Sequence, residues 1–140
     1  MKLKHILCVA VILPCILSFV SCSGGIKGDE AKAHINNFFD AIAAEDYGKA
    51  ETLLHPHRPY DLEEFFLNAE KETGIDFQAG ITIERYTSFS SVYYDSEVMG
   101  SNYELTMDTT VGEKAVEFEI EIVKNESGFG IYNLDLDTTP

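Results

Sequence analysis

The chain has 140 residues, with 24 Asp and Glu against 10 Lys and Arg, and a net charge of −14 at pH 7. Its first 22 residues, by contrast, hold two of the basic residues and no acidic one. If the segment before Cys22 is removed, 119 residues remain, with 8 Lys and Arg against 24 Asp and Glu and a net charge of −16. Such a chain is expected to form one domain. Its charge excludes nucleic-acid partners, because their binding depends on Lys and Arg that neutralise phosphates.

The N-terminal segment is typical of a bacterial export signal. Two lysines lie near its start, and an apolar run interrupted by single small residues follows from residue 6 to residue 20. This run is shorter than the about 20 apolar residues that a membrane-spanning helix needs. The sequence F-V-S-C then ends at Cys22. It resembles the lipobox of bacterial lipoproteins, with Phe19 where that family usually has Leu.

This resemblance implies that residues 1–21 are a signal peptide and that Cys22 is lipidated and becomes the mature N-terminus. The protein would then be anchored by lipid to the extracytoplasmic face of the bacterial cell membrane. The other two cysteines lie in the removed segment, so the mature chain has no disulfide. Residues 22–29, which include three glycines, are expected to be a flexible tether to a single domain at 30–140. The alternative is an uncleaved signal anchor.

Apolar residues at helical spacing predict helices in the first part of the domain. Asp29 is expected to cap the first helix, and a second short helix is expected to begin at Asp46, to carry Leu53 and Leu54 on its apolar face and to end before Pro56. The apolar stripe of the first helix consists of Ile35, Phe38, Phe39 and Ile42.

A third helix is predicted between the capping-box residue Asp61 and Gly74. After Gly80 the apolar residues alternate with polar ones, which indicates strands. Turn sequences at Gly112-Glu113 and at 125–128 predict antiparallel hairpins. The fold class is therefore α+β, with three N-terminal helices packed on a curved antiparallel sheet of about four strands. The expected strand segments are 81–83, a long bent strand within 86–100, 103–111, 116–122 and 129–137.

A family resemblance supports this fold class. It rests on the run F-F-D-A-I-A-A-E-D-Y-G-K-A from Phe38 to Ala50, the following L-L-H-P, and the terminal G-I-Y-N-L-D-L from Gly130 to Leu136. These segments resemble the NTF2-like, cystatin-like cone superfamily, and most of all its small bacterial lipoproteins of unknown function. The resemblance covers about residues 30–137 and implies a cone-shaped fold. It implies no particular activity, because this fold hosts many.

The turn His55-Pro56-His57 is the one cluster of the mature domain that offers a metal site or a general base. Two histidines at this spacing can bind zinc, but a third ligand would have to come from a carboxylate such as Asp61. A structural turn is the favoured interpretation, and His34 is expected to face the solvent or to lie at the boundary of the core. No catalytic residue, metal ligand or cofactor is therefore assigned, and the protein is not expected to be an enzyme.

Four aromatic residues form a candidate ligand pocket, because NTF2-like folds enclose a concavity. Strand alternation and helical spacing place these residues on the inner side of the fold, without an inward Asp or His to complete an acid/base pair. Packing in the core is the competing interpretation. The four residues are Phe38, Phe39, Tyr103 and Tyr132.

Acidic residues at alternate positions predict a field of carboxylates on the outer surface of the sheet. They do not form the compact oxygen-rich loop that calcium prefers, so a solvated face is favoured. Such a face fits a non-catalytic module that binds a basic extracytoplasmic protein or a small ligand. The alternatives are an enzyme or metal-dependent factor that uses the His55/His57 turn, and a folded spacer without a ligand. The acidic residues are Glu104, Asp108, Glu117, Glu119, Glu121, Asp135 and Asp137.

Replacement of Cys22 by Ser tests the lipid anchor. The wild-type protein should partition with membranes and carry a mass increment at Cys22, because two acyl chains suffice for stable anchoring. The Cys22→Ser protein should lack the increment and should be released or stall before processing. Membrane fractionation and mass spectrometry measure both effects. Identical fractionation and migration of the two proteins would contradict the lipoprotein interpretation.

Overall fold

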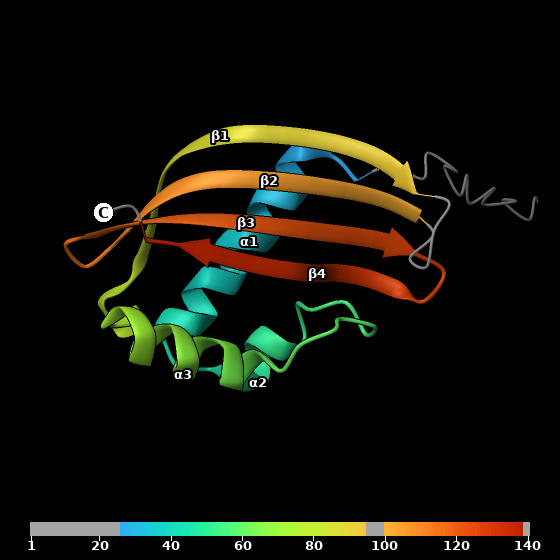
Figure 1. The fold of residues 1–140 in the computed structure, drawn as a ribbon. Helices are drawn as coiled ribbons and strands as arrows, with labels where there is room; N and C mark the ends of the chain where they lie inside the picture. Colours follow the sequence, from blue (N-terminus) through green and yellow to red (C-terminus); the bar gives the residue numbers. More distant parts are fainter. Residues whose placement is uncertain (1–25, 95–99, 139–140) are drawn as a thin grey trace, which may run out of the picture.

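The structure, a computed structural model, describes residues 26–94 and 100–138. The expected export signal, Cys22 and half of the expected tether, residues 22–25, lie outside these residues. The described residues form an α+β fold, which confirms the expected class, and Figure 1 shows its helices and strands. The elements are the helices α1 (Gly28–Ala43), α2 (Tyr47–Glu51) and α3 (Leu62–Thr73), the short 3-10 helix η1 (Phe77–Ala79), and the strands β1 (Ile81–Tyr94), β2 (Gly100–Val111), β3 (Lys114–Asn125) and β4 (Gly128–Asp137).

The four strands form one curved antiparallel sheet in the order β1-β2-β3-β4, so strands that follow each other in the chain are neighbours in space. In Figure 1, α1 runs obliquely behind the sheet, and α2 and α3 lie beyond the β4 edge. The predicted hairpin turns are confirmed, because Val111 pairs with Lys114 and Asn125 pairs with Gly128. The face of the sheet that α1 covers holds the core, and the opposite face is the outer face.

The first helix carries the predicted apolar stripe, and all four of its residues are buried. The expected cap at Asp29 is wrong. The helix begins at Gly28, and its N-cap residue is Lys27, whose side chain makes no capping hydrogen bond. Asp29 lies in the first turn, where its negative charge interacts favourably with the positive end of the helix dipole. Ile26 is also buried in the core. The ordered domain therefore includes part of the segment that was expected to be a tether.

The second helix is capped by Asp46 as predicted, because the Asp46 carboxylate accepts a hydrogen bond from the backbone N–H of Lys49 at 3.0 Å. The prediction that Leu53 and Leu54 belong to this helix is wrong, since it ends at Glu51. Leu54 instead pairs with Ile131 of β4 in a parallel bridge. Pairing with the strand edge satisfies backbone groups that a continued helix would have used.

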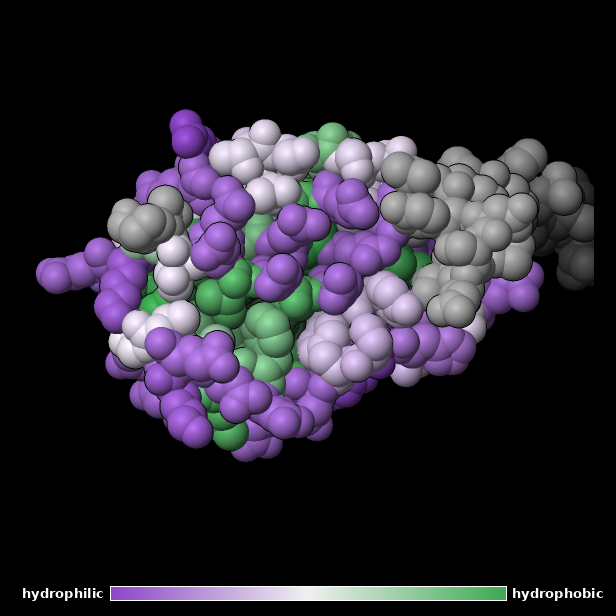
Figure 2. All heavy atoms as spheres, viewed as in Figure 1, coloured by the Kyte–Doolittle hydropathy of each residue, from purple (hydrophilic) through white to green (hydrophobic). Residues whose placement is uncertain are grey.

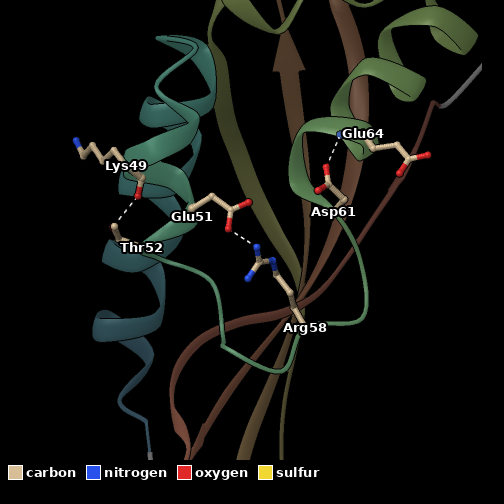
Figure 3. Close-up of polar contacts among 6 residues, drawn as sticks. All are labelled: Lys49, Glu51, Thr52, Arg58, Asp61 and Glu64. Atoms are coloured by element: carbon tan, nitrogen blue, oxygen red, sulfur yellow. Dashed lines mark hydrogen bonds and ion pairs between the residues drawn. The ribbon is translucent and has the colours of Figure 1, made fainter.

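The third helix has both predicted ends. The Asp61 carboxylate accepts a hydrogen bond from the backbone N–H of Glu64 at 2.9 Å, a cap that Figure 3 shows. Gly74 closes the helix with φ of 66°, a left-handed conformation that glycine adopts without strain. The following η1 was not expected from the sequence, and it brings Phe77 into the core.

Phenylalanines from several elements meet in the core. Phe39 of α1 contacts Phe118 of β3 with ring centroids 4.9 Å apart, and Phe66 of α3 contacts Phe77 of η1 at the same centroid distance. Phe38 lies 6.2 Å from Phe66, measured between ring centroids. All five side chains are at most 2% exposed. These rings hold the helices and the sheet together, because fully buried aromatic side chains remove large apolar areas from water.

The first strand is longer than expected. The sequence indicated a strand at 81–83 and a bent strand within 86–100, but β1 continues without a break from Ile81 to Tyr94. Its pairing with β2 shifts twice, between Ile83 and Arg85 and between Tyr86 and Ser88. Bulges of this kind bend a strand while keeping it in the sheet, which explains the loss of simple alternation in this segment.

Truncation of a central phenylalanine tests this core. Phe118→Ala, or Phe38→Ala, should lower the free energy of unfolding by about 3–5 kcal/mol, because both rings are fully buried. Leu67→Ala is the matched control, since Leu67 is 54% exposed and its truncation should cost less than about 0.5 kcal/mol. Urea unfolding measures the difference. Costs below about 1 kcal/mol at both phenylalanines would remove them from the core.

Candidate functional site

The turn between α2 and α3 brings His55 into the interior. His55 is fully buried, whereas His57 is exposed. The backbone N–H of His55 donates to the carbonyl of Ile131 at 2.8 Å, and the N–H of Ile131 donates to the carbonyl of Leu53 at 3.0 Å. The turn is therefore hydrogen-bonded to the outer edge of β4.

Both ring nitrogens of His55 are engaged within the chain. Nδ1 lies 3.2 Å from the backbone nitrogen of His57, and because that N–H can only donate, Nδ1 accepts. The proton of the neutral ring is therefore on Nε2, which donates to Oδ1 of Asn125 at 2.9 Å. A metal ion at His55 would have to displace one of these partners. The geometry favours a structural role for this histidine.

Asn125 and Gly130 fix the turn against the β3–β4 hairpin. Oδ1 of Asn125 accepts three hydrogen bonds, from His55 and from the backbone N–H groups of Ser127 and Gly128. A Cβ atom at Gly130 would lie 2.5 Å from the backbone carbon of Leu54, so the close approach of the turn requires glycine there. The sequence marked Asn125 as a turn residue, but it gave no sign of its bond to His55.

His34 also supports this segment. His34, on α1, is half-buried, and its Nε2 lies 2.6 Å from the carbonyl oxygen of Leu53. Its ring also contacts Phe129, with centroids 4.7 Å apart. Of the two positions expected for His34, solvent-facing or at the boundary of the core, the structure shows the boundary position. Hydrogen bonds of His34 and His55 thus connect the α2–α3 segment to α1 and to the sheet.

Arg58 links the α2–α3 segment back to α2. It forms an ion pair with Glu51, which Figure 3 shows as a bond between the loop and the helix. The Nε atom of Arg58 and the hydroxyl of Tyr60 are buried and have no hydrogen-bond partner. Burial raises the pKa of Tyr60 far above its ordinary range, while nearby Arg58 lowers it and Glu51 raises it. Tyr60 is therefore a neutral phenol that does not supply a base at this position.

The four residues of the candidate pocket fall into three separate sets of contacts. Phe38 and Phe39 are packed in the core, at most 2% exposed. Tyr103 contacts Phe89 on β1, with ring centroids 5.2 Å apart. Tyr132 contacts His55, with centroids 5.9 Å apart. A shift in the β3–β4 register leaves Tyr132 without a paired residue on β3, so the simple alternation used to place it does not hold there.

The carboxylates expected on the outer face align across three strands. Glu104 pairs directly with Glu121, Asp108 with Glu117, Glu119 with Asp135, and Glu117 with Asp137. Figure 2 shows hydrophilic side chains on this face of the sheet, with pale and hydrophobic patches between them. We refer to these residues as the acidic face, which consists of Glu104, Asp108, Glu117, Glu119, Glu121, Asp135 and Asp137.

Little positive charge balances the acidic face. Among the residues that the structure describes, Arg85 is the one cation in an ion pair with it, and its Nε lies 2.6 Å from a carboxylate oxygen of Asp108. Like charges directly opposite each other destabilise a sheet. The acidic face therefore lowers the stability of the folded domain.

The pKa of Glu121 is raised, first by burial and then by the neighbouring carboxylates. Burial raises the pKa of Glu121, a hydrogen bond from the Asn102 amide lowers it, and the charges of Glu104 and Glu119 raise it. Asn102 is itself 3% exposed, and its Oδ1 has no hydrogen-bond partner. No sequence pattern predicts the burial of Asn102, because it depends on the packing of neighbouring strands.

Two further findings concern the described part of the chain. Within residues 26–94 and 100–138, no three His, Cys, Asp or Glu side chains come close enough to share a metal ion. None of the helices in these ranges has the length and apolar character that a membrane crossing requires.

Replacement of His55 tests its structural role. His55→Ala should lower the free energy of unfolding by about 1–3 kcal/mol, because it leaves Oδ1 of Asn125 and the N–H of His57 with one partner fewer inside the fold. His57→Ala is the matched control and should change stability by less than about 0.5 kcal/mol, since that ring is exposed. Urea unfolding measures both. Equal small costs at the two positions would contradict the structural assignment.

Comparison with known proteins adds no assignment to this geometry. No family model, no curated protein and no solved structure matches the chain. The function of the domain therefore has to be inferred from its own residues.

Proposed function

We propose that this chain is a bacterial lipoprotein, anchored outside the cytoplasm through Cys22, whose domain binds a partner rather than catalysing a reaction. The acidic face is the binding surface, and a basic extracytoplasmic protein is the partner that its charge favours, with a small cationic ligand as the second choice. The observation that carries this proposal is the direct pairing of carboxylates across β2, β3 and β4.

The pairing supports binding because it works against folding. A sheet surface that served only to be soluble would alternate acidic and basic side chains, since opposite charges stabilise cross-strand pairs and like charges destabilise them. A surface of one sign attracts partners of the opposite sign and raises their rate of association. The repulsion between paired carboxylates thus destabilises the isolated domain, and a basic partner would relieve it.

The packing of the core favours binding at the outside of the fold. We interpret the curved sheet around α1 as a small NTF2-like cone, a fold that in other proteins encloses a ligand. Here the inner side is occupied by Phe38, Phe39 and Phe118, which are at most 2% exposed and in ring contact with one another or with neighbouring rings. A ligand inside the cone would have to displace them, so the outer face is the better candidate.

The alternative of an enzyme or metal-dependent factor depends on the His55/His57 turn. His55 uses one ring nitrogen to bind Asn125 and the other to accept from His57, which leaves no free nitrogen. Asp61, the suggested third ligand, accepts the N-terminal hydrogen bond of α3. These residues are therefore occupied in holding the fold, which supports the binding proposal over the catalytic one.

Neutralisation of the central strand tests the binding surface. The triple variant Glu117→Gln, Glu119→Gln and Glu121→Gln should remain folded, because it relieves repulsion between paired carboxylates. It should retain far less of any basic partner captured from the cell's own membranes at low salt. Capture by the unchanged protein should also fall as salt rises, since exposed charges are screened over about 8 Å at physiological ionic strength.

A second triple variant controls for net charge alone. Glu63→Gln, Glu72→Gln and Glu113→Gln remove three exposed carboxylates that lie on α3 and in the β2–β3 turn, away from the acidic face. This variant should capture the partner as the unchanged protein does. If both triple variants lose the partner equally, or neither does, the acidic face is not the binding surface.

A further inference from the structure

Aromatic and basic side chains gather where α1 begins. Phe89 of β1 lies beside Gly28, where a Cβ atom would be 3.8 Å from its Cζ atom. The Phe89 ring contacts Tyr103 of β2, and Nζ of Lys32 lies 4.8 Å from the ring centroid of Tyr86. We refer to this region as the N-terminal surface, which consists of Lys27, Lys32, Tyr86, Phe89 and Tyr103.

Phe89 is exposed although it lies on the inner face of the sheet. It is 49% exposed, and Leu67 is the other large hydrophobic side chain with high exposure among the described residues. Phe89 pairs with Leu105, whose side chain is fully buried, so it is on the face of the sheet that α1 covers. The helix begins beside it, and the ring is left half in solvent.

The charge of the N-terminal surface differs from that of the acidic face. Lys27 and Lys32 are exposed there, and Asp29 and Glu30 in the first turn of α1 balance them, so this end of the molecule is close to neutral. The acidic face lies on the other side of the sheet, because the neighbours Ser90 and Glu104 alternate with Phe89 and Leu105. An anionic lipid surface would therefore repel the acidic face and not the N-terminal surface.

The position of the lipid anchor brings this surface close to the membrane. Ile26 is buried in the core, and it follows Cys22 by four positions, with three residues between them. Each residue spans at most about 3.6 Å, so the two Cα atoms are at most about 14 Å apart. The domain consequently has little freedom to turn another side toward the lipid.

From these observations, and on the basis of the proposed lipidation of Cys22, we infer that the N-terminal surface contacts the lipid bilayer. Phe89 and Tyr103 lie at the level of the headgroups, where aromatic side chains are favoured, and Lys27 and Lys32 extend toward lipid phosphates. The acidic face then points away from the membrane, toward partners in the surrounding compartment. The bilayer thus fixes the orientation of the binding surface.

A tryptophan reporter tests this orientation, because the chain contains no tryptophan of its own. Phe89→Trp replaces a half-exposed aromatic ring by another, and Leu67→Trp places the same reporter at the other exposed hydrophobic position, on α3. Each full-length lipidated variant is reconstituted into phosphatidylcholine vesicles with and without brominated acyl chains. Circular dichroism verifies the fold of both.

We expect brominated lipid to quench the emission of the Phe89→Trp variant by about twofold, and to leave the Leu67→Trp variant unchanged, since interfacial aromatic side chains reach the acyl boundary. No quenching at position 89, or equal quenching at both positions, would overturn the inferred orientation while leaving the lipid anchor intact. A chain without the mass increment at Cys22 would refute the anchor itself and the orientation with it.

Discussion

The burial of one face of α1 in the curve of the sheet is the constraint on which the rest of the structure depends. Every strand contributes apolar side chains to the side that faces the helix, and Phe39 and Phe118 join the two layers directly. The sheet can close around the helix because β1 bends at two register shifts. Without this contact neither layer would have a core, since a single helix or a single sheet cannot bury its own apolar face.

The two edges of the sheet are protected in different ways. An exposed edge strand offers unpaired backbone groups to other chains, and bulges or covering segments reduce this hazard. β1 has two register shifts, whereas β4 is covered at Ile131 by the segment that contains Leu54 and His55. His55 thus belongs to the segment that covers an edge of the sheet, which explains why its side chain is buried and both of its ring nitrogens are hydrogen-bonded.

The sheet also separates an acidic surface from an aromatic surface that is close to neutral. Its outer face collects carboxylates in direct cross-strand pairs, and the side that α1 covers leaves Phe89 half-exposed next to the start of the helix. The chain that follows the proposed lipid anchor joins the domain beside Phe89, because α1 begins there. A protein that is held at the membrane by one side and presents charge on the other has the arrangement that a tethered binding module requires.

The sequence by itself determined the fold class, the apolar stripe of α1, the caps at Asp46, Asp61 and Gly74, both hairpin turns and the outward position of the carboxylates. These features depend on residues that are close in the chain, where helical and strand periodicity and capping chemistry act. Only the tertiary structure decided the end of α2, the bond between His55 and Asn125, the register shift at Tyr132 and the exposure of Phe89. Each of these depends on segments far apart in the chain, and local periodicity contains no information about which of them meet.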